Sequence, residues 1–289
     1  MLNQCQKLIL KIQDQWHHAF QCHQSWQVEQ LSPKEHYTNR ILTTSGKVLE
    51  KGGIAMSQLR GQHLPESASL RYPKLKGKPF DVVGLSLVLH PMNPFVPSVH
   101  ANLRFFQCDT TWWFGGGMDL SPYYPISTDC QHWHRTIKAA CDQTDPEFYP
   151  NFKAWCDDYF YLKHRNHMRG IGGIFFDDLN EPNFNTLLNF TKTLGQCLID
   201  AYLPILEDHQ NDSYTQPEKD FQVHRRARYA EFNLLYDRGT LFGLQFGGRV
   251  ESILMSMPPL AAWHYDWQPQ PGSREAKLES FLMPQDWIS

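Results

Sequence analysis

The sequence DVVGLSLVLHPMNPFVPSVHANLRFFQCDTTWWFGGGMDLSPYY, residues 81–124, decides the fold because it holds two alternating segments joined by a proline-rich connection. Every second residue of a strand points to the same face. One face is apolar and carries Val83, Leu85, Leu87 and Leu89 in the first segment, and Val99, Ala101, Leu103 and Phe105 in the second. The pattern predicts two paired antiparallel strands whose apolar face lies under helices.

The opposite face of this predicted hairpin is polar. If His90 lies across from His100, then Val88 faces Asn102 and Ser86 faces Arg104. The polar residues that share this face are Ser86, His90, His100, Asn102 and Arg104. Such residues can be scattered over a solvated surface. We favour a functional site because the set is short, varied and poor in Lys and Glu.

Composition limits the class of protein. The 289 residues fit one domain, 1–289, and a hydrophobic content of 41% is enough for a core. The net charge of −3 argues against a general binder of nucleic acid or anionic membranes. Seven cysteines form no C-x-x-C pair, which favours a reducing, cytoplasmic location. No apolar run approaches a membrane span.

The rest of the chain mixes helical and strand patterns. Helices are expected over residues 2–30, around 130–141, from Pro146 to about residue 169, and over 183–207, with a buried strand over 171–178. Residues 228–249 read as a hairpin that turns near Asp237–Gly239, and residues 31–80 contain a polar stretch and a Pro-punctuated loop. The order favours a mixed α and β fold without the regular alternation of a doubly wound sheet.

Several residues outside the predicted hairpin could also serve a site, although the chain has no phosphate loop or dinucleotide fingerprint. Gly115–Gly117 could form a tight turn or let a flat ligand approach the backbone. Asp119 could accept ligand N–H groups or cap a helix. Arg104 and Arg249 carry planar guanidinium groups that suit carboxylates.

Four histidines are placed by periodicity on faces that could point inward: His90, His100, His134 and His164. Together they could bind a transition metal, donate to carboxylates, or act as acid and base. The sequence contains no tight pair that brings them into one site, because His132 and His134 point to opposite sides of their helix.

The chain resembles oxygen-dependent coproporphyrinogen III oxidases. The matching strings are SLVLHPMNPFVPSVHANLRFF, WWFGGGMDLSPYYP, HWHRT, YFYLKHRNHMRGIGGIFFDDL and RYAEFNLLYDRGTLFGLQFGGRVESILMSMPP. They cover roughly residues 80–270 in family order, and they are long and specific.

The resemblance implies an α+β fold with a large antiparallel sheet flanked by helices on both faces, working as a homodimer through about residues 229–264. It implies that two propionates of coproporphyrinogen III are oxidatively decarboxylated to vinyl groups, giving protoporphyrinogen IX in haem biosynthesis. Molecular oxygen is the co-substrate, and no flavin, haem or nicotinamide is expected.

The resemblance also assigns roles to residues. The substrate-binding positions are Ser86, Asn102, Leu103, Arg104, Gly247, Gly248 and Arg249. His100 is the expected proton donor, and Arg104 belongs to the catalytic set with it. The four histidines, His90, His100, His134 and His164, are the positions of a possible divalent metal cation. We further hypothesise that Asp119 accepts pyrrole N–H groups and helps to deprotonate one.

The N-terminal part departs from the family pattern. LSPKEHYTNRIL replaces the usual Gly-rich, Arg-containing loop, and Gly53-Ile54-Ala55-Met56-Ser57 lacks the usual Asn. The rim of the site formed by residues 31–57 is therefore expected to differ. Two other classes compete with the enzyme: a porphyrin- or haem-binding protein that has lost catalysis, and a histidine-metal hydrolase. Substrate binding without turnover would indicate the first, and chelator-sensitive activity without oxygen uptake would indicate the second.

Overall fold

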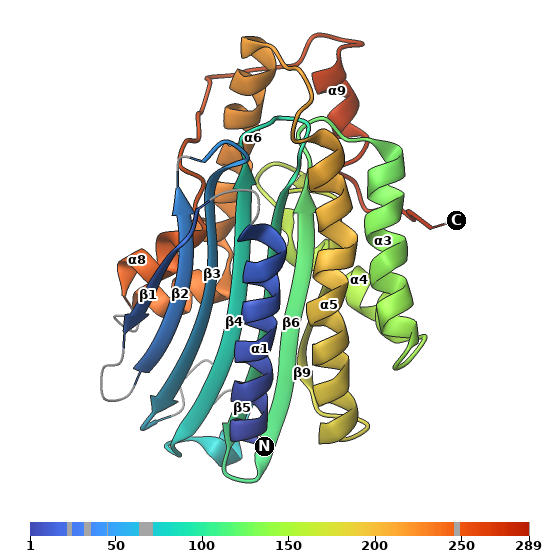
Figure 1. The fold of residues 1–289 in the computed structure, drawn as a ribbon. Coiled ribbons are helices and arrows are strands. Elements are labelled where there is room, and N and C mark those ends of the chain that lie inside the picture. Colours follow the sequence, from blue (N-terminus) through green and yellow to red (C-terminus); the bar gives the residue numbers. More distant parts are fainter. Residues whose placement is uncertain (22–24, 32–35, 45, 64–71, 246–248, 289) are drawn as a thin grey trace.

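The computed structural model describes residues 1–21, 25–31, 36–44, 46–63, 72–245 and 249–288. Its centre is an antiparallel seven-stranded sheet in the order β1-β2-β3-β4-β5-β6-β9 (Figure 1). The strands are β1 (Gln27–Leu31), β2 (His36–Thr44), β3 (Leu49–Gly61), β4 (Phe80–Pro91), β5 (Ser98–Cys108), β6 (Thr111–Ser121) and β9 (Gly172–Leu179). A separate two-stranded hairpin pairs β7 (Tyr161–Leu162) with β8 (His167–Met168).

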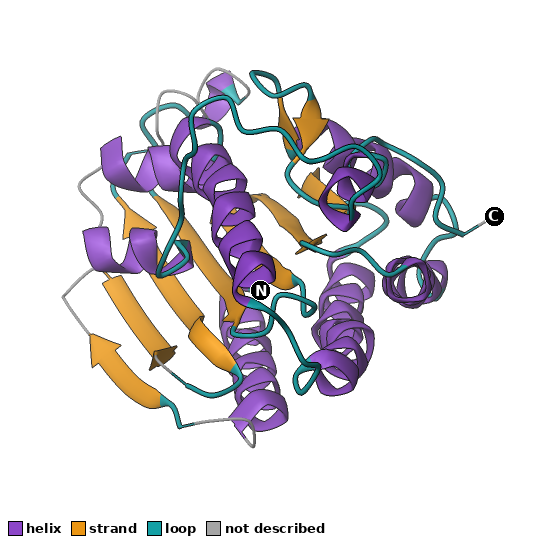
Figure 2. Ribbon diagram, turned by 90° about the horizontal axis from the view of Figure 1, so that it is seen from above, coloured by secondary structure: helices purple, strands orange, loops and turns teal. Residues whose placement is uncertain are grey.

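Helices lie on both sides of this sheet, as the view from above shows (Figure 2). They are α1 (Leu2–Gln21), α3 (Ser127–Asp142), α4 (Phe148–Tyr159), α5 (Phe184–His209), α6 (Gln216–Leu235), α7 (Arg238–Gln245), α8 (Val250–Ile253) and α9 (Arg274–Glu279), with 3-10 turns η1 (Pro73–Leu75) and η2 (Leu254–Ser256). The prediction of an α+β fold with helices on both faces of a large antiparallel sheet is confirmed. No described helix is long and apolar enough to cross a membrane.

The predicted hairpin of residues 81–124 is present, but its predicted register is wrong by two residues. Val88 pairs with His100, Ser86 with Asn102 and Gly84 with Arg104. The last pair before the connection is Leu89 with Val99, so His90 lies beyond the β4–β5 strand pairs. A shift of two residues leaves each side chain on its predicted face, because the side-chain period of a strand is two. The polar and apolar faces were therefore predicted correctly.

The apolar face of the sheet packs under α1 and α5. Val83, Leu85, Leu87 and Leu89 are each at most 2% exposed and join one core cluster with both helices. The helices touch each other closely, because a Cβ at Gly195 would meet Ile12 at 2.8 Å. This layer is the main hydrophobic core, and it fixes which face of the sheet stays polar.

The other face of the sheet is approached by α6 and by the segment that contains α7, α8 and η2. The inner residues of α6 recur every three to four positions: Gln222, Arg226, Tyr229 and Asn233, all at most 5% exposed. The hairpin predicted over residues 228–249 is wrong, since α6 and α7 occupy that range. The inward positions of α6 are mostly polar, so the sequence lacks the apolar stripe that would have indicated a helix.

The N-terminal prediction was also partly wrong. The helix expected over residues 2–30 ends at Gln21, and the residues predicted as polar stretch and loop contain β2 and β3. The helix expected to reach residue 169 ends at Tyr159, and His164 lies in the turn between β7 and β8. Phe160, Leu162 and Met168 are buried there by tertiary packing that no helical period records.

Six cysteines are free and buried: Cys5, Cys108, Cys130, Cys141, Cys156 and Cys197. Cys22 lies outside the described residues. Burial raises the pKa of the thiols, to about 12 for Cys5, Cys130 and Cys197.

Candidate active site

A row of residues crosses the polar face of the sheet from one edge toward the other. The strand register places them side by side in the order Glu29, Arg40, Ala55, Ser86, Asn102 and Gly117. Directly opposed residues of antiparallel strands lie about 5 Å apart. Ser86 and Asn102, predicted to bind a ligand, are therefore neighbours on this face.

A buried group of three side chains lies next to this row. The Asp119 carboxylate accepts hydrogen bonds from Arg169, at 2.8 Å from Nε and 2.7 Å from Nη2. His100 Nδ1 lies 2.8 Å from the same Asp119 Oδ1. Arg169 and Asp119 are at most 4% exposed, so this is an ion pair in a low-dielectric setting.

The surroundings keep this group charged and fixed. Burial alone would raise the pKa of Asp119, but the Arg169 guanidinium and the hydrogen bond from His100 lower it. The rings of Phe160, Tyr229 and Phe232 surround Arg169, with centroids 4.3, 4.4 and 4.6 Å from its Cζ. Asp119 is therefore an acceptor, and His100 Nδ1 carries the proton that it donates to Asp119.

This arrangement sets the chemistry available to His100. Because Nδ1 donates to Asp119, Nε2 is the ring atom left to exchange a proton with a ligand. Among the described residues Nε2 has no hydrogen-bond partner, and the side chain is 16% exposed. An imidazole held this way can hold or deliver a proton at Nε2.

Arg104 lies flat on β6, over the first residue of the triple glycine. A Cβ at Gly115 would meet Arg104 Nε at 2.6 Å and Asp177 Oδ1 at 2.7 Å. Arg104 Nη2 pairs with that Asp177 oxygen at 3.1 Å, and Nη1 donates to Asn102. Gly115–Gly117 therefore do not form a tight turn. They are a strand segment that leaves room for a guanidinium.

Two further guanidinium groups, those of Arg40 and Arg249, lie at the other end of the row. Arg40, 1% exposed, donates to Glu29 Oε2 at 2.6 Å and to Ser252 Oγ at 2.9 Å. Arg249 donates to Glu29 Oε1 at 3.0 Å. One carboxylate of the chain thus holds two arginines together. Arg40 and Arg169 are not among the predicted site residues, although Arg40 lies within the string LSPKEHYTNRIL that departs from the family pattern.

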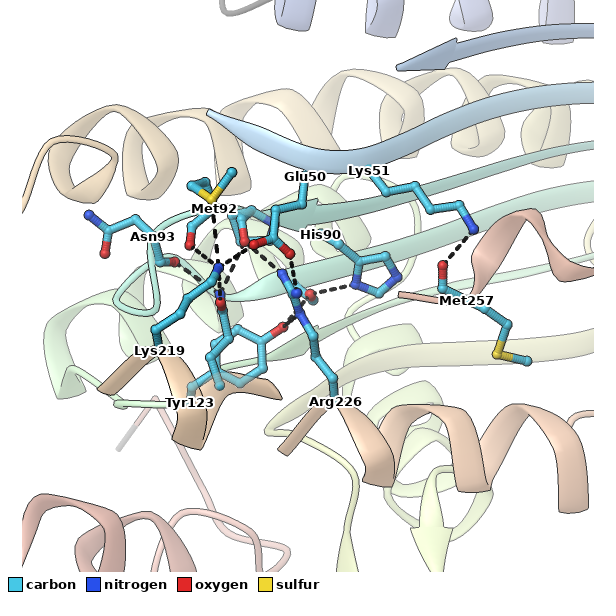
Figure 3. A network of polar contacts seen from close by, with 12 residues as sticks. Glu50, Lys51, His90, Met92, Asn93, Tyr123, Lys219, Arg226 and Met257 are labelled. Carbon is cyan, nitrogen blue, oxygen red and sulfur yellow. Dashed lines mark hydrogen bonds and ion pairs between the residues drawn. The ribbon is translucent and has the colours of Figure 1, made fainter. Parts of the chain in front are cut away.

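His90 is held in a different network, at the end of β4 (Figure 3). Its Nε2 donates to the Ser256 carbonyl at 2.9 Å, and its Nδ1 lies 2.9 Å from Ser98 Oγ. The network continues to Arg226, which pairs with Glu50. Burial and the positive charge of Arg226 hold the pKa of His90 well below its usual range.

Both ring nitrogens of the other two histidines, His134 and His164, also have hydrogen-bond partners. His134 Nε2 donates to the Ile171 carbonyl at 3.1 Å, Nδ1 lies 3.1 Å from Tyr149 Oη, and burial lowers its pKa to about 3. His164 contacts Tyr236 Oη at 2.8 Å and Glu231 Oε2 at 2.7 Å. In the described part of the chain no three His, Cys, Asp or Glu residues form a group that could hold a metal ion. His90, His100, His134 and His164 therefore do not fit one metal centre.

The three remaining predicted substrate-binding positions are Leu103, Gly247 and Gly248. The Leu103 side chain is 1% exposed and belongs to the apolar core, so it lies on the face of the sheet opposite to Asn102 and Arg104. Gly247 and Gly248 lie outside the described residues. The side chains of residues 102 and 104 therefore lie on the polar face, and the side chain of residue 103 lies on the apolar face.

The comparisons with known proteins agree with this geometry. A family model described as coproporphyrinogen III oxidase matches residues 1–287. An oxygen-dependent coproporphyrinogen-III oxidase of Francisella tularensis subsp. holarctica (strain LVS) is 54% identical over 257 residues, covering 87% of this chain and 83% of that protein. Another of the same name, from Coxiella burnetii (strain Dugway 5J108-111), is 55% identical over 254 residues, covering 86% and 82%.

The sheet face with its oriented imidazole and guanidinium groups is thus part of an enzyme, an oxidoreductase. The chain belongs to the coproporphyrinogen III oxidase family. The expectation drawn from the motifs of residues 80–270 is confirmed at this level.

Proposed function

We propose that this enzyme converts coproporphyrinogen III to protoporphyrinogen IX in haem biosynthesis, in the cytoplasm. In each of two rounds a propionic acid side chain becomes a vinyl group and CO2, while O2 takes up two electrons and two protons to give hydrogen peroxide. The observation that carries the proposal is the polar sheet face, where the oriented His100 and Arg104 lie on the same face of β5 on either side of Asn102, with Arg40 and Arg249 farther along.

The substrate's charge suits this face. Coproporphyrinogen III has four carboxylates around an electron-rich macrocycle, and guanidinium forks bind carboxylates through paired hydrogen bonds. Arg104, Arg40 and Arg249 supply three such forks, each already paired with a carboxylate of the chain. A propionate that takes the place of Glu29 or Asp177 finds its partners already oriented. Ser86 and Asn102 add neutral donors between the two groups of arginines.

His100 is the proton donor in this proposal. Asp119 and Arg169 orient its ring and keep the proton exchange at Nε2. The hypothesis that Asp119 itself accepts pyrrole N–H groups stays a prediction. Both of its oxygens already receive hydrogen bonds from Arg169, so that role needs one of these bonds to be shared or broken.

We infer a homodimer that forms through about residues 229–264. Large apolar side chains are exposed along this segment: Leu234 at 46%, Leu235 at 55%, Leu244 at 43%, Val250 at 50%, Leu260 at 62% and Trp263 at 56%. Exposed large apolar side chains that gather along one segment are consistent with a protein–protein contact there.

The first experiment is turnover by chelator-treated protein. Coproporphyrinogen III is incubated in air and without oxygen, and protoporphyrin is measured by fluorescence after oxidation. Product only in air, without added metal, is the expected result. Product only after metal is restored would contradict our conclusion that the histidines form no metal centre. Bound substrate that is never converted would favour the porphyrin-binding protein.

A further inference from the structure

The side of α6 that faces away from the sheet carries a second concentration of charge. Successive residues of a helix are about 100° apart, so Arg228 points away from the inward Arg226. We call Arg165, His224, Arg225, Arg228 and Glu231 the outer cluster. Arg165 reaches it from the turn between β7 and β8, and the other four lie on α6.

Glu231 is the carboxylate at the centre of the outer cluster, and its oxygens are fully used. Oε1 accepts from Arg165 Nη2 at 2.6 Å, from Arg228 Nη1 at 3.0 Å and from Trp263 Nε1 at 2.9 Å. Oε2 accepts from Arg165 Nε at 2.9 Å and from His164 Nε2 at 2.7 Å. Five donors on one carboxylate leave no acceptor for further guanidinium groups.

The outer cluster therefore contains donors without acceptors. Within the described residues, the guanidinium of Arg225 makes no hydrogen bond or ion pair, although the side chain is partly buried. Arg228 Nε and His224 Nδ1 are buried and also lack partners there. The three guanidinium groups share the Glu231 carboxylate, and Glu279 is a second carboxylate whose charge reaches Arg225 without a hydrogen bond to it. Arginine stays protonated in proteins, so this excess is not relieved by loss of a proton.

The pKa shifts point in the same direction. Burial and the neighbouring Arg228 lower the pKa of Arg225 to about 9. Burial, Arg228 and Arg225 lower the pKa of His224 to about 4, so the ring adds no charge at neutral pH. Arg225 and Arg228 are both desolvated, and each is repelled by a neighbouring arginine, so a bound anion would stabilise them.

We propose that the outer cluster binds an oxyanion through Arg225 and Arg228. Its chemistry is that of a carboxylate or phosphate group, which matches a guanidinium fork. The oxyanion can be a free ion or a carboxylate of a second copy of the chain. Trp263 donates a hydrogen bond to Glu231, and the His264 ring stacks on the His224 ring with the centroids 5.4 Å apart. Both Trp263 and His264 belong to the segment that we propose for the dimer. The site differs from the sheet face and does not depend on turnover.

The test compares the full-length protein with Arg225→Gln, and with Arg135→Gln as a control that removes an exposed arginine of α3. Thermal unfolding is followed in inorganic phosphate and in chloride of equal ionic strength. Self-association is followed by analytical ultracentrifugation. For a free oxyanion, phosphate raises the wild-type Tm by ligand linkage, and Arg225→Gln loses that rise. If the oxyanion is a carboxylate of a second copy of the chain, Arg225→Gln weakens self-association about ten-fold or more. This amount corresponds to one lost charged contact.

A third measurement, the Tm without phosphate, distinguishes anion binding by Arg225 from a purely structural role of this residue. If Arg225 is an uncompensated cation, Arg225→Gln under dilute, phosphate-free conditions unfolds at a temperature equal to or above that of the wild type. A lower Tm there, with unchanged phosphate response and unchanged self-association, overturns the proposal. If the Gln variant does not fold, Arg225→Lys keeps the charge but not the fork, and the same two readouts apply. Its phosphate response or self-association must fall, and full retention of both overturns the proposal.

Discussion

Replacing Glu29 by Gln tests whether this carboxylate occupies the place of a substrate propionate. The side chains of Glu29 and Arg249 are 39% and 42% exposed, so solvent screens their ion pair and its loss has a small effect. Glu29→Gln keeps the size of the side chain and removes the charge that competes for Arg40 and Arg249. Removal of this screened competing charge should lower the KM for coproporphyrinogen III by about two- to five-fold.

The assay is initial-rate product fluorescence in air, repeated with coproporphyrin III as a non-reacting tetracarboxylate whose binding is measured by fluorescence quenching. Asp81→Asn is the control, since it makes the same change in net charge but frees only Arg60 at the far end of β3. A higher KM for Glu29→Gln would refute the reasoning. It would mean that Glu29 orients Arg40 for the substrate and does not compete with it.

Three other substitutions have expected outcomes. Arg169→Met removes the guanidinium from the buried Asp119 carboxylate and leaves it only the hydrogen bond from His100. It should lower the free energy of unfolding by about 3–5 kcal/mol in urea titrations and lower kcat. A stable, active variant would show that the ion pair is dispensable. Ala55→Asn restores the amide usual in the family between Arg40 and Ser86, so kcat/KM should change while the urea midpoint does not. The low pKa of His134 means that the unfolded chain binds a proton that the folded chain refuses, so stability falls below about pH 6.5 by up to about 1.4 kcal/mol per pH unit for this residue. His134→Asn should reduce that slope between pH 7 and pH 5, and an unchanged slope would contradict it.

The faces of the central strands were predictable from the sequence, but the exact register was not. Alternation fixes which side of the sheet each residue of β4 and β5 occupies, and a shift of two residues leaves that unchanged. The register depends on the connection, where Pro91, Pro94 and Pro97 have no N–H to donate. His90 consequently lies beyond the last β4–β5 pair and bonds to Ser98 and Ser256.

The histidine positions show a second limit of sequence reasoning. Periodicity predicted correctly that His134 points inward, but its partners come from Ile171 and Tyr149, which are distant in the sequence. Arg169 was interpreted as a residue near a helix end, and its pairing with Asp119 exists only because β9 lies next to β6. Inward-facing polar residues, as on α6, hide the period on which a helix prediction depends.

The buried cysteines have a consequence for the lifetime of the enzyme. The thiolate is the form of cysteine that peroxide oxidises to sulfenic acid and beyond. A pKa of about 12, as at Cys5, Cys130 and Cys197, leaves roughly one thiol in 10⁵ ionised at neutral pH. Each turnover in the proposed reaction releases hydrogen peroxide next to the enzyme. The fold therefore protects these three sulfur atoms from the oxidant that its catalysis would generate.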